Sequence, residues 1–270
     1  MIFTDQLRRD VLLSFPPKRI ISLVPSQSEL LFDLGLNEEI IGVTKFCIRP
    51  KEKTKSRIKI GGTKDINLEK VKSLYPDLII GNKEENNEEQ VKELMKEFPV
   101  WMSNIRILEE AYEMIISIGK LVEKYHEASS LVSEIKFHFK NLNSNITGPQ
   151  PYKTTYKNRI CYLIWRNPYM TVGADTFIND MLKTAGFENI FSGKTRYPVI
   201  ELQEISDLTP DYIFLSSEPY PFKENHVQQI QNMLPLSKVL LVDGEMFSWY
   251  GSRLLKSAAY FLQLHKKLKV

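Results

Sequence analysis

The sequence predicts an α/β fold with two similar Rossmann-like lobes. Each lobe is expected to hold a mainly parallel sheet, and one long rigid helix joins the lobes, with a cleft between them. The first observation is a repeat, since NLEKVKSLYPDLII at residues 67–80 and ELQEISDLTPDYIF at residues 201–214 share five identical positions. A repeat at half the chain length indicates two similar structural units. The second observation is the alternation of short apolar stretches with amphipathic ones, which is typical of parallel sheets covered by helices.

The first half begins with RIISLV at residues 19–24, an apolar and β-branched run that ends at Pro25. We expect a buried strand there. Ser26 is expected to cap the next helix, with Glu29 in the capping-box position and Gly35 just past the helix end. The other elements expected in this half are strand 39–44, helix 68–74, strand 77–80, helix 88–98 and strand 100–102.

The second half repeats this order, with expected elements at strand 159–165, helix 176–186, helix 202–208, strand 211–217, helix 227–235 and strand 238–244. Between the halves, two helices are expected with a break between Gly119 and Tyr125. The second helix, at 124–143, would span roughly 30 Å at 1.5 Å per residue. A turn-rich loop is expected at 143–158. The expected domains are an N-terminal α/β lobe at 1–122, a connecting backbone helix at 123–145 and a C-terminal α/β lobe at 146–270.

The composition excludes several classes of protein. The chain has 36 basic and 33 acidic residues, a balance that argues against a nucleic-acid or membrane surface. Two cysteines are too few for a disulfide scaffold, and the four histidines do not have metal-ligand spacing, so we expect no bound metal ion. The first residues do not read as a secretory signal, so we expect a chain that is cytoplasmic or has lost its leader. We also expect a monomer.

Aromatic residues gather where strands of the second lobe are expected to end. In open α/β sheets, ligands bind beyond the carboxyl ends of the strands. The rings in these loops include Trp165, Tyr169, Tyr197, Trp249 and Tyr250. Any one of them is equally consistent with core packing, but loops rarely place so many rings in a core. We therefore interpret the group as a pocket wall for a large, flat, partly apolar molecule.

The sequence resembles the periplasmic binding proteins of the vitamin B12 and ferric-siderophore class, the helical-backbone metal receptors. The resemblance covers about Pro17 to Leu264. It rests on RIISLVPSQSELLFDLGL, IGVTKFCIRP, GGTKDINLEKVKSLYPDLII, NPYMTVGADTFINDMLKTAGFENIF and the WYGSR loop near the end. Within that superfamily the sequence is most similar to the cobalamin-binding branch.

The resemblance implies a substrate-binding protein of an ABC-type importer, in the periplasm or cell envelope. Such a protein binds a corrinoid of the cobalamin type, or a related metal chelate, between its lobes without chemical change and without a catalytic cofactor. The ligand-binding residues expected from the loops and the resemblance are Ser26, Phe46, Thr63, Trp165, Arg166, Tyr169, Met170, Tyr197, Asp243, Trp249, Tyr250 and Arg253. Of these, Asp243 and Arg253 are expected to meet polar side groups of the ligand.

The resemblance also implies contact with a membrane permease through one carboxylate on each lobe. Glu69 falls at that position in the first lobe, and Gln203 with the adjacent Glu204 falls there in the second. A solvated helix face explains these residues equally well.

Two alternatives to a corrinoid cargo stay open. Enteric cobalamin binders have tryptophans where this chain has Thr63, Asn82 and Val199, so the pocket is also suited to haem or a ferric siderophore. A chelatase-like tetrapyrrole enzyme has two similar lobes as well, but it needs a metal-binding histidine or carboxylate pair. No histidine lies near an expected strand end, which favours a binding protein over an enzyme.

Overall fold

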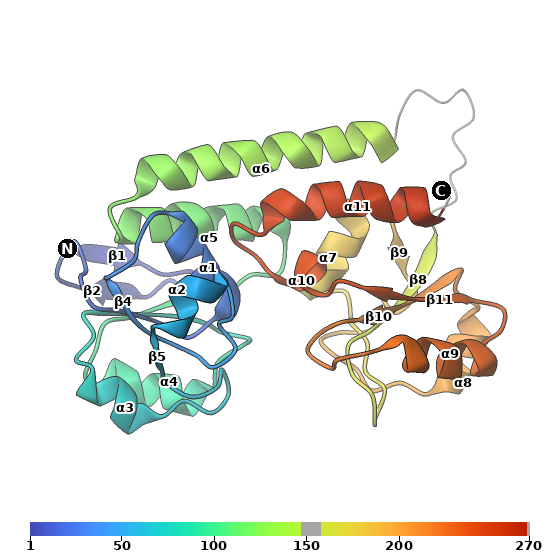
Figure 1. The fold of residues 1–270 in the computed structure, drawn as a ribbon, viewed down its shortest axis with the longest axis horizontal. Helices are drawn as coiled ribbons and strands as arrows, with labels where there is room; N and C mark the ends of the chain where they lie inside the picture. Colours follow the sequence, from blue (N-terminus) through green and yellow to red (C-terminus); the bar gives the residue numbers. More distant parts are fainter. Residues whose placement is uncertain (147–157, 269–270) are drawn as a thin grey trace. The chain divides into compact units, whose positions relative to one another are not determined.

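The computed structural model describes residues 1–146 and 158–268 (Figure 1). The chain forms two compact units. Unit 1 comprises Met1–Ile105, Glu109–Ile135 and Tyr250–Arg253, and unit 2 comprises Arg106–Leu108, Lys136–Trp249 and Leu254–Val270. Each unit holds one parallel sheet with helices, so the predicted fold class is confirmed. The domain boundaries predicted after residues 122 and 145, and the cleft between lobes, stay predictions. The loop predicted at 143–158 lies mostly outside the described residues.

Unit 1 contains a five-stranded parallel sheet in the order β5-β4-β3-β6-β7. The strands are β3 (Ile20–Ser22), β4 (Ile40–Val43), β5 (Ile58–Lys59), β6 (Leu78–Asn82) and β7 (Val100–Ser103). Because β3 comes first in this sheet along the chain and lies at its centre, the loops after β3, β4 and β6 leave the same carboxyl edge side by side. The first four helices are α1 (Pro25–Asp33), α2 (Lys51–Lys55), α3 (Leu68–Ser73) and α4 (Glu88–Met95).

The start of α1 differs from the prediction. Val24 is the N-cap residue, Pro25 occupies the first turn, and no side chain caps the helix. Proline is favoured at the first helical position because its missing N–H would have no partner there and its φ is already helical. The helix therefore begins before Ser26, and the predicted capping role of Ser26 is wrong. Gly35 follows the helix with φ of +92°, as a C′ glycine should.

An antiparallel hairpin at the N-terminus was not predicted. It consists of β1 (Ile2–Thr4) and β2 (Asp10–Leu12). The Asp5 side chain closes its turn, since Oδ1 accepts the backbone N–H groups of Leu7 and Arg9 and Oδ2 accepts the Arg9 guanidinium. The strands are too short, and the turn too polar, to show an alternating pattern in sequence.

Unit 2 contains a four-stranded parallel sheet in the order β11-β10-β8-β9. The strands are β8 (Arg159–Leu163), β9 (Glu188–Asn189), β10 (Tyr212–Ser216) and β11 (Lys238–Val242). Its helices include α7 (Phe177–Thr184), α8 (Leu202–Leu208), α9 (Glu224–Met233), α10 (Glu245–Ser248) and α11 (Leu254–Leu268). Thr176 caps α7 through its side chain, and Gly186 follows that helix with φ of +81°.

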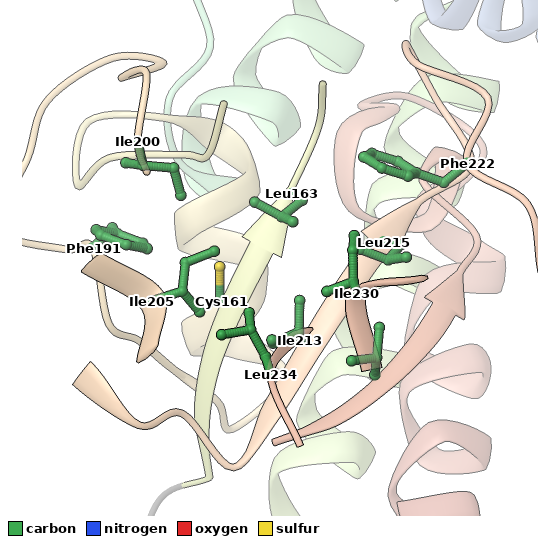
Figure 2. Packing of buried hydrophobic residues seen from close by; sticks show 11 residues of the cluster. Cys161, Leu163, Phe191, Ile200, Ile205, Ile213, Leu215, Phe222, Ile230 and Leu234 are labelled. Carbon is green, nitrogen blue, oxygen red and sulfur yellow. The ribbon is translucent and has the colours of Figure 1, made fainter. Parts of the chain in front are cut away.

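One face of the unit 2 sheet supports a dense apolar cluster, shown in Figure 2. Cys161 and Leu163 of β8 and Ile213 and Leu215 of β10 lie in it, because residues two apart on a strand point to the same face. Phe222, which follows β10, is buried in the same cluster. Cys161 and Cys47 are both buried and free, as expected of small apolar side chains. The cluster thus fixes the base of the loops that leave the carboxyl edge.

The repeated segment forms α3 and β6 in unit 1 and α8 and β10 in unit 2. In unit 1, Asp77 accepts the backbone N–H groups of Lys18 and Arg19, and the Arg19 guanidinium donates to the carbonyl groups of Leu74 and Tyr75. This set of bonds ties the start of β3 to the turn before its neighbour β6.

Unit 2 has the same arrangement at equivalent positions. Asp211 accepts the backbone N–H of Arg159, and the Arg159 guanidinium donates to the carbonyl groups of Leu208 and Thr209. Tyr75 and Thr209 occupy the same left-handed conformation, each with φ of 43°. Each unit therefore uses the repeated segment once to hold two neighbouring strands in register, which explains why the aspartate recurs in it.

Two helices run between the halves, α5 (Leu108–Leu121) and α6 (Tyr125–Ile146). The predicted break between Gly119 and Tyr125 is confirmed, and Glu123 has φ of 58° within it. Gly119 allows the close approach of the two helices, because a β carbon there would lie 2.4 Å from the Ala128 β carbon. Over residues 1–146 and 158–268, no helix has the length and apolar content needed to cross a membrane.

Candidate functional site

The loop after β8 forms a small hairpin at the carboxyl edge of the unit 2 sheet. Trp165 and Met170 form an antiparallel bridge, and Ile164 N–H donates to the Met170 carbonyl at 3.0 Å. Met170 also bridges Val199, so the 165–170 loop is tied to the segment that precedes α8. Arg166 and Tyr169 lie within this hairpin. Backbone pairing therefore fixes the loop, and Tyr169 packs against the apolar cluster of unit 2.

Trp165 presents an exposed ring at this edge, with 40% of its surface accessible. The ring packs edge-on against Tyr220 at 5.7 Å between centroids. Tyr220 in turn contacts Phe222 at 4.7 Å and His226 at 5.6 Å. Because Phe222 belongs to the buried cluster of unit 2, an exposed ring is held by rings that reach into the core. This is a suitable wall for a flat apolar ligand.

Trp249 is held differently, in the loop after β11. It is only 7% exposed, and its Nε1–H donates to Glu218 Oε1 at 2.9 Å. Ser248 Oγ–H donates to the same oxygen at 2.6 Å. Burial raises the pKa of the Glu218 carboxyl, and the nearby Glu245 and Asp243 raise it further. The indole is thus fixed by a half-buried carboxylate, a pairing across 31 positions that no sequence pattern indicates.

Asp243 and Tyr197 also lie in loops of unit 2. Asp243 Oδ1 accepts the backbone N–H of Glu245 at 3.1 Å, and the Asp243 N–H donates to the Tyr260 hydroxyl at 2.8 Å. This aspartate therefore helps to shape its own loop at the start of α10. Tyr197 is half-buried, and the Arg196 guanidinium lies 5.9 Å from its ring centroid.

The carboxyl edge of unit 1 carries the remaining expected positions in loops after its strands. Phe46, after β4, is 51% exposed, and Lys45 Nζ lies 5.2 Å from its ring centroid. Gly62 lies against this ring, since a β carbon there would be 3.3 Å from Phe46 Cε2. Thr63 is half-buried, and its carbonyl accepts Asn86 Nδ2–H at 3.1 Å. Ser26 is 4% exposed, and its hydroxyl has no hydrogen-bond partner among the described residues.

Tyr250 and Arg253 belong to unit 1. The Tyr250 hydroxyl donates to a carboxylate oxygen of Glu85. Arg253 forms a two-pronged ion pair with Glu29, in which Nε–H donates to Oε2 at 2.8 Å and NH2 donates to Oε1. Both side chains are buried, with 4% and 9% of their surfaces exposed. A structural role is therefore visible for Arg253, and its contact with ligand stays a prediction.

The two expected docking carboxylates differ in their surroundings. Glu69 is exposed in the first turn of α3. Glu204 is occupied, because Oε1 accepts the Glu201 N–H in a capping box and Oε2 pairs with Lys194 Nζ at 2.6 Å. The Lys194 contact is the main cause that lowers the Glu204 pKa. The residue equivalent to Glu69 is Gln203, which is exposed and bonds to Asp207.

The described residues contain no set of side chains that could together bind a metal ion. Among them, no group of three or more His, Cys, Asp or Glu side chains could hold an ion. The exposed rings at the carboxyl edges are suited to holding a molecule.

Two α/β units, each with ring-bearing loops at the carboxyl edge of a parallel sheet, define a small-molecule binding protein. A sequence model of the family described as "Periplasmic binding protein" matches residues 20–235, and the chain belongs to that family. The expected resemblance is thereby confirmed at the level of the family.

Curated relatives agree with this assignment. The chain is 29% identical over 219 residues to an ABC transporter substrate-binding lipoprotein of Bacillus subtilis, covering 77% of this chain and 67% of that protein. It is 27% identical over 203 residues to the vitamin B12-binding protein of Vibrio campbellii, covering 74% of this chain and 71% of that protein.

Solved structures show the same fold. The periplasmic vitamin B12 binding protein of Vibrio cholerae matches with a TM-score of 0.79 at 20% identity, covering 95% of this chain and 99% of that one. A periplasmic haem binding protein of Pseudomonas aeruginosa matches with a TM-score of 0.80 at 18% identity, covering 93% of both chains. The protein is thus a substrate-binding protein of the ABC-transporter class, which binds its cargo without transforming it.

Proposed function

We propose that the cargo is a corrinoid or a related metal macrocycle, bound by the ring-bearing loops at the carboxyl edges of the sheets. The observation that carries the proposal is Trp165, a large ring that is exposed at such an edge and held from behind by Tyr220. The carboxyl edge of a parallel sheet is where α/β proteins bind ligands, and binding sites there are lined mainly by apolar and aromatic side chains. The names of the vitamin B12-binding relatives support a corrinoid over other flat ligands.

The proposal includes delivery to an ABC permease from the periplasm or cell envelope, the setting that the names of the relatives indicate. Glu69 and Glu204 are the proposed docking carboxylates. Charges at the rim of such an interface mainly set the rate and orientation of docking.

A titration of tryptophan emission tests the cargo. Cyanocobalamin, dicyanocobinamide, haem and a ferric siderophore are added to wild type and to Trp165→Ala. A macrocycle in the site quenches the emission of wild type at micromolar concentration. If the macrocycle covers the 40% of Trp165 that is exposed, about 100 Å² leaves water, which is worth about 2.5 kcal/mol. Trp165→Ala should therefore bind up to roughly sixtyfold more weakly.

Trp101→Phe is the matched control, because Trp101 lies in β7 with 1% of its surface exposed and donates to the Thr4 carbonyl. Its affinity should equal that of wild type. If none of the four compounds quenches wild type, the macrocycle proposal fails. If one binds with equal affinity to Trp165→Ala, the site lies elsewhere.

A further inference from the structure

The acidic and basic side chains at the carboxyl edges are unequally partnered. Two carboxylates at these edges are occupied within the protein, since Glu218 accepts from Trp249 and Ser248 and Glu85 accepts from Tyr250. Two cations at the same edges, Arg166 and Lys45, have no carboxylate within ion-pair distance in the ranges 1–146 and 158–268. The imbalance leaves positive charge available to a ligand.

Arg166 is the stronger case. Its Nε is buried and has no hydrogen-bond partner among the described residues, although the side chain as a whole is only half-buried. A guanidinium nitrogen that has lost water without gaining an acceptor destabilises the unliganded protein, and a ligand acceptor would remove that cost. Arg166 also lies close enough to His226 to lower the pKa of its imidazole, after burial, which is the larger cause.

The position of Arg166 is also suited to ligand contact. It follows the exposed Trp165 in the hairpin whose backbone is fixed by the bridges of Met170 to Trp165 and Val199. Arginine presents a planar fork of donors that matches a carboxylate, whereas it has no acceptor to offer an amide. An exposed ring and an unpaired guanidinium in one rigid loop fit a ligand with an apolar face and an anionic margin.

Unit 1, considered by itself, has the same pairing of ring and cation. Lys45 lies over the exposed Phe46, beside Gly62. The surrounding segment 45–64 contains eight lysines and arginines and a single glutamate, in a chain whose net charge is only +3. A clustered charge of this kind attracts anions to the surface that carries it.

We propose that the cargo is an anionic chelate and that Arg166 binds one of its peripheral carboxylates while Trp165 packs against its apolar face. The inference rests on the proposed function for the location of the site, and it adds the charge class of the cargo.

Matched ligand pairs test the inference. Dicyanocobyrinic acid carries peripheral carboxylates where dicyanocobinamide carries amides, and haem carries propionates that haem dimethyl ester lacks. These four compounds are titrated against wild type, Arg166→Gln and Lys238→Gln. A ferric tris-catecholate is titrated in the same way, as an anionic chelate that is not a macrocycle. Lys238 is exposed at the opposite end of β11, so Lys238→Gln removes one positive charge from the same unit but not from the candidate site.

The acid of at least one pair should bind about tenfold or more tighter than its amide or ester. Loss of a charge-assisted hydrogen bond should cost Arg166→Gln roughly tenfold to a hundredfold in affinity for the acid, with little change for the neutral form. Lys238→Gln should match wild type, and raised salt should reduce the difference between acid and neutral form. Equal thermal unfolding of the two variants confirms that the fold is intact.

Other outcomes separate this inference from the proposed function. Neutral forms that bind as tightly as the acids, or an equal loss for both in Arg166→Gln, would overturn the inference and leave the macrocycle function standing. Binding of the ferric tris-catecholate alone, weakened by Arg166→Gln, would support an anionic cargo held by Arg166, and would overturn both the peripheral carboxylate and the macrocycle function. Failure of every compound to bind overturns both.

Discussion

Replacing Glu29 by Gln should destabilise unit 1, because it leaves the Arg253 guanidinium buried against a neutral amide. The two side chains are 9% and 4% exposed, and the guanidinium donates to both carboxylate oxygens. Removing one partner of a buried ion pair costs about 3–5 kcal/mol. Glutamine keeps one acceptor oxygen, so we expect about 3 kcal/mol, at the lower end of that range.

Urea unfolding, followed by circular dichroism, measures this loss. With a slope of about 3 kcal/mol per molar urea, the midpoint should fall by roughly 1 M. Glu52→Gln is the matched control, since the Glu52–Lys55 pair is 3.7 Å long and largely exposed, and such pairs contribute about 0–1 kcal/mol. The double variant Glu29→Met with Arg253→Met should recover most of the stability, because apolar side chains of similar volume replace a buried pair at little cost.

The opposite pattern would refute this reasoning. If Glu29→Gln unfolds at the wild-type midpoint and instead weakens cargo binding, the ion pair is not a stability element. Arg253 would then act mainly on ligand, as the resemblance to cobalamin binders implied.

Three further predictions concern other sites. Glu218→Gln should keep Trp249 in place, whereas Glu218→Ala should lose about 1–3 kcal/mol because the buried indole N–H loses its acceptor; urea midpoints compare the two. Because the raised pKa of Glu218 means that the folded state holds this proton more tightly, its contribution to stability falls as pH rises from 4.5 through the raised value. The stability of Glu218→Gln relative to wild type should therefore increase over that window, and a constant difference would contradict the burial argument. Gly119→Ala should destabilise by about 1–3 kcal/mol in thermal unfolding, since the added methyl would overlap the neighbouring helix, and an unchanged midpoint would show that the helices separate freely. Charge reversal at Glu69 and Glu204 should reduce permease stimulation at unchanged cargo affinity, with the larger effect at the exposed Glu69; unchanged transport in the double reversal would argue against docking there.

The two similar halves were predictable because a short segment of each one, which contains the aspartate of the register contacts, recurs in the sequence. Asp77 and Asp211 occupy the same position of the repeated segment, whereas their partners Arg19 and Arg159 lie 58 and 52 residues earlier, at the start of the neighbouring strand. Strand runs rich in β-branched residues, and the glycines after helices, added to that signal. A repeated helix–turn–strand segment can be recognised in a sequence before its contacts are known.

The features that the sequence did not reveal are of two kinds. In one, two neighbouring residues favour different helix starts, and in the other, residues far apart in sequence form a contact. Ser26 has the chemistry of a cap, but Pro25 beside it begins the helix earlier. Glu218 reads as an ordinary loop acid, and its bond to Trp249 exists only once β10 and β11 pair in register. Helix α11 was not predicted, although its apolar face is plain once its bounds are known.

The gathering of rings in loops after strands was predictable, but the exposure of each ring was not. Trp165 and Trp249 both follow strand ends, yet one is 40% exposed and the other 7%. The indole N–H of Trp249 has an acceptor in the half-buried Glu218. Sequence position at a strand end therefore locates the rings without showing which of them face solvent.

The division of the chain has a consequence for attempts to express half of the protein. Unit 1 is not a continuous stretch of polypeptide, because Tyr250–Arg253 belongs to it while the residues on both sides belong to unit 2. A fragment that stops at residue 146 would keep the Glu29 carboxylate without its counter-ion and the Glu85 carboxylate without the Tyr250 hydroxyl. A short peptide that contains residues 250–253 should bind to such a fragment and restore these contacts. A cut within residues 250–253 should destabilise unit 1, although most of that unit lies more than a hundred residues earlier in the sequence.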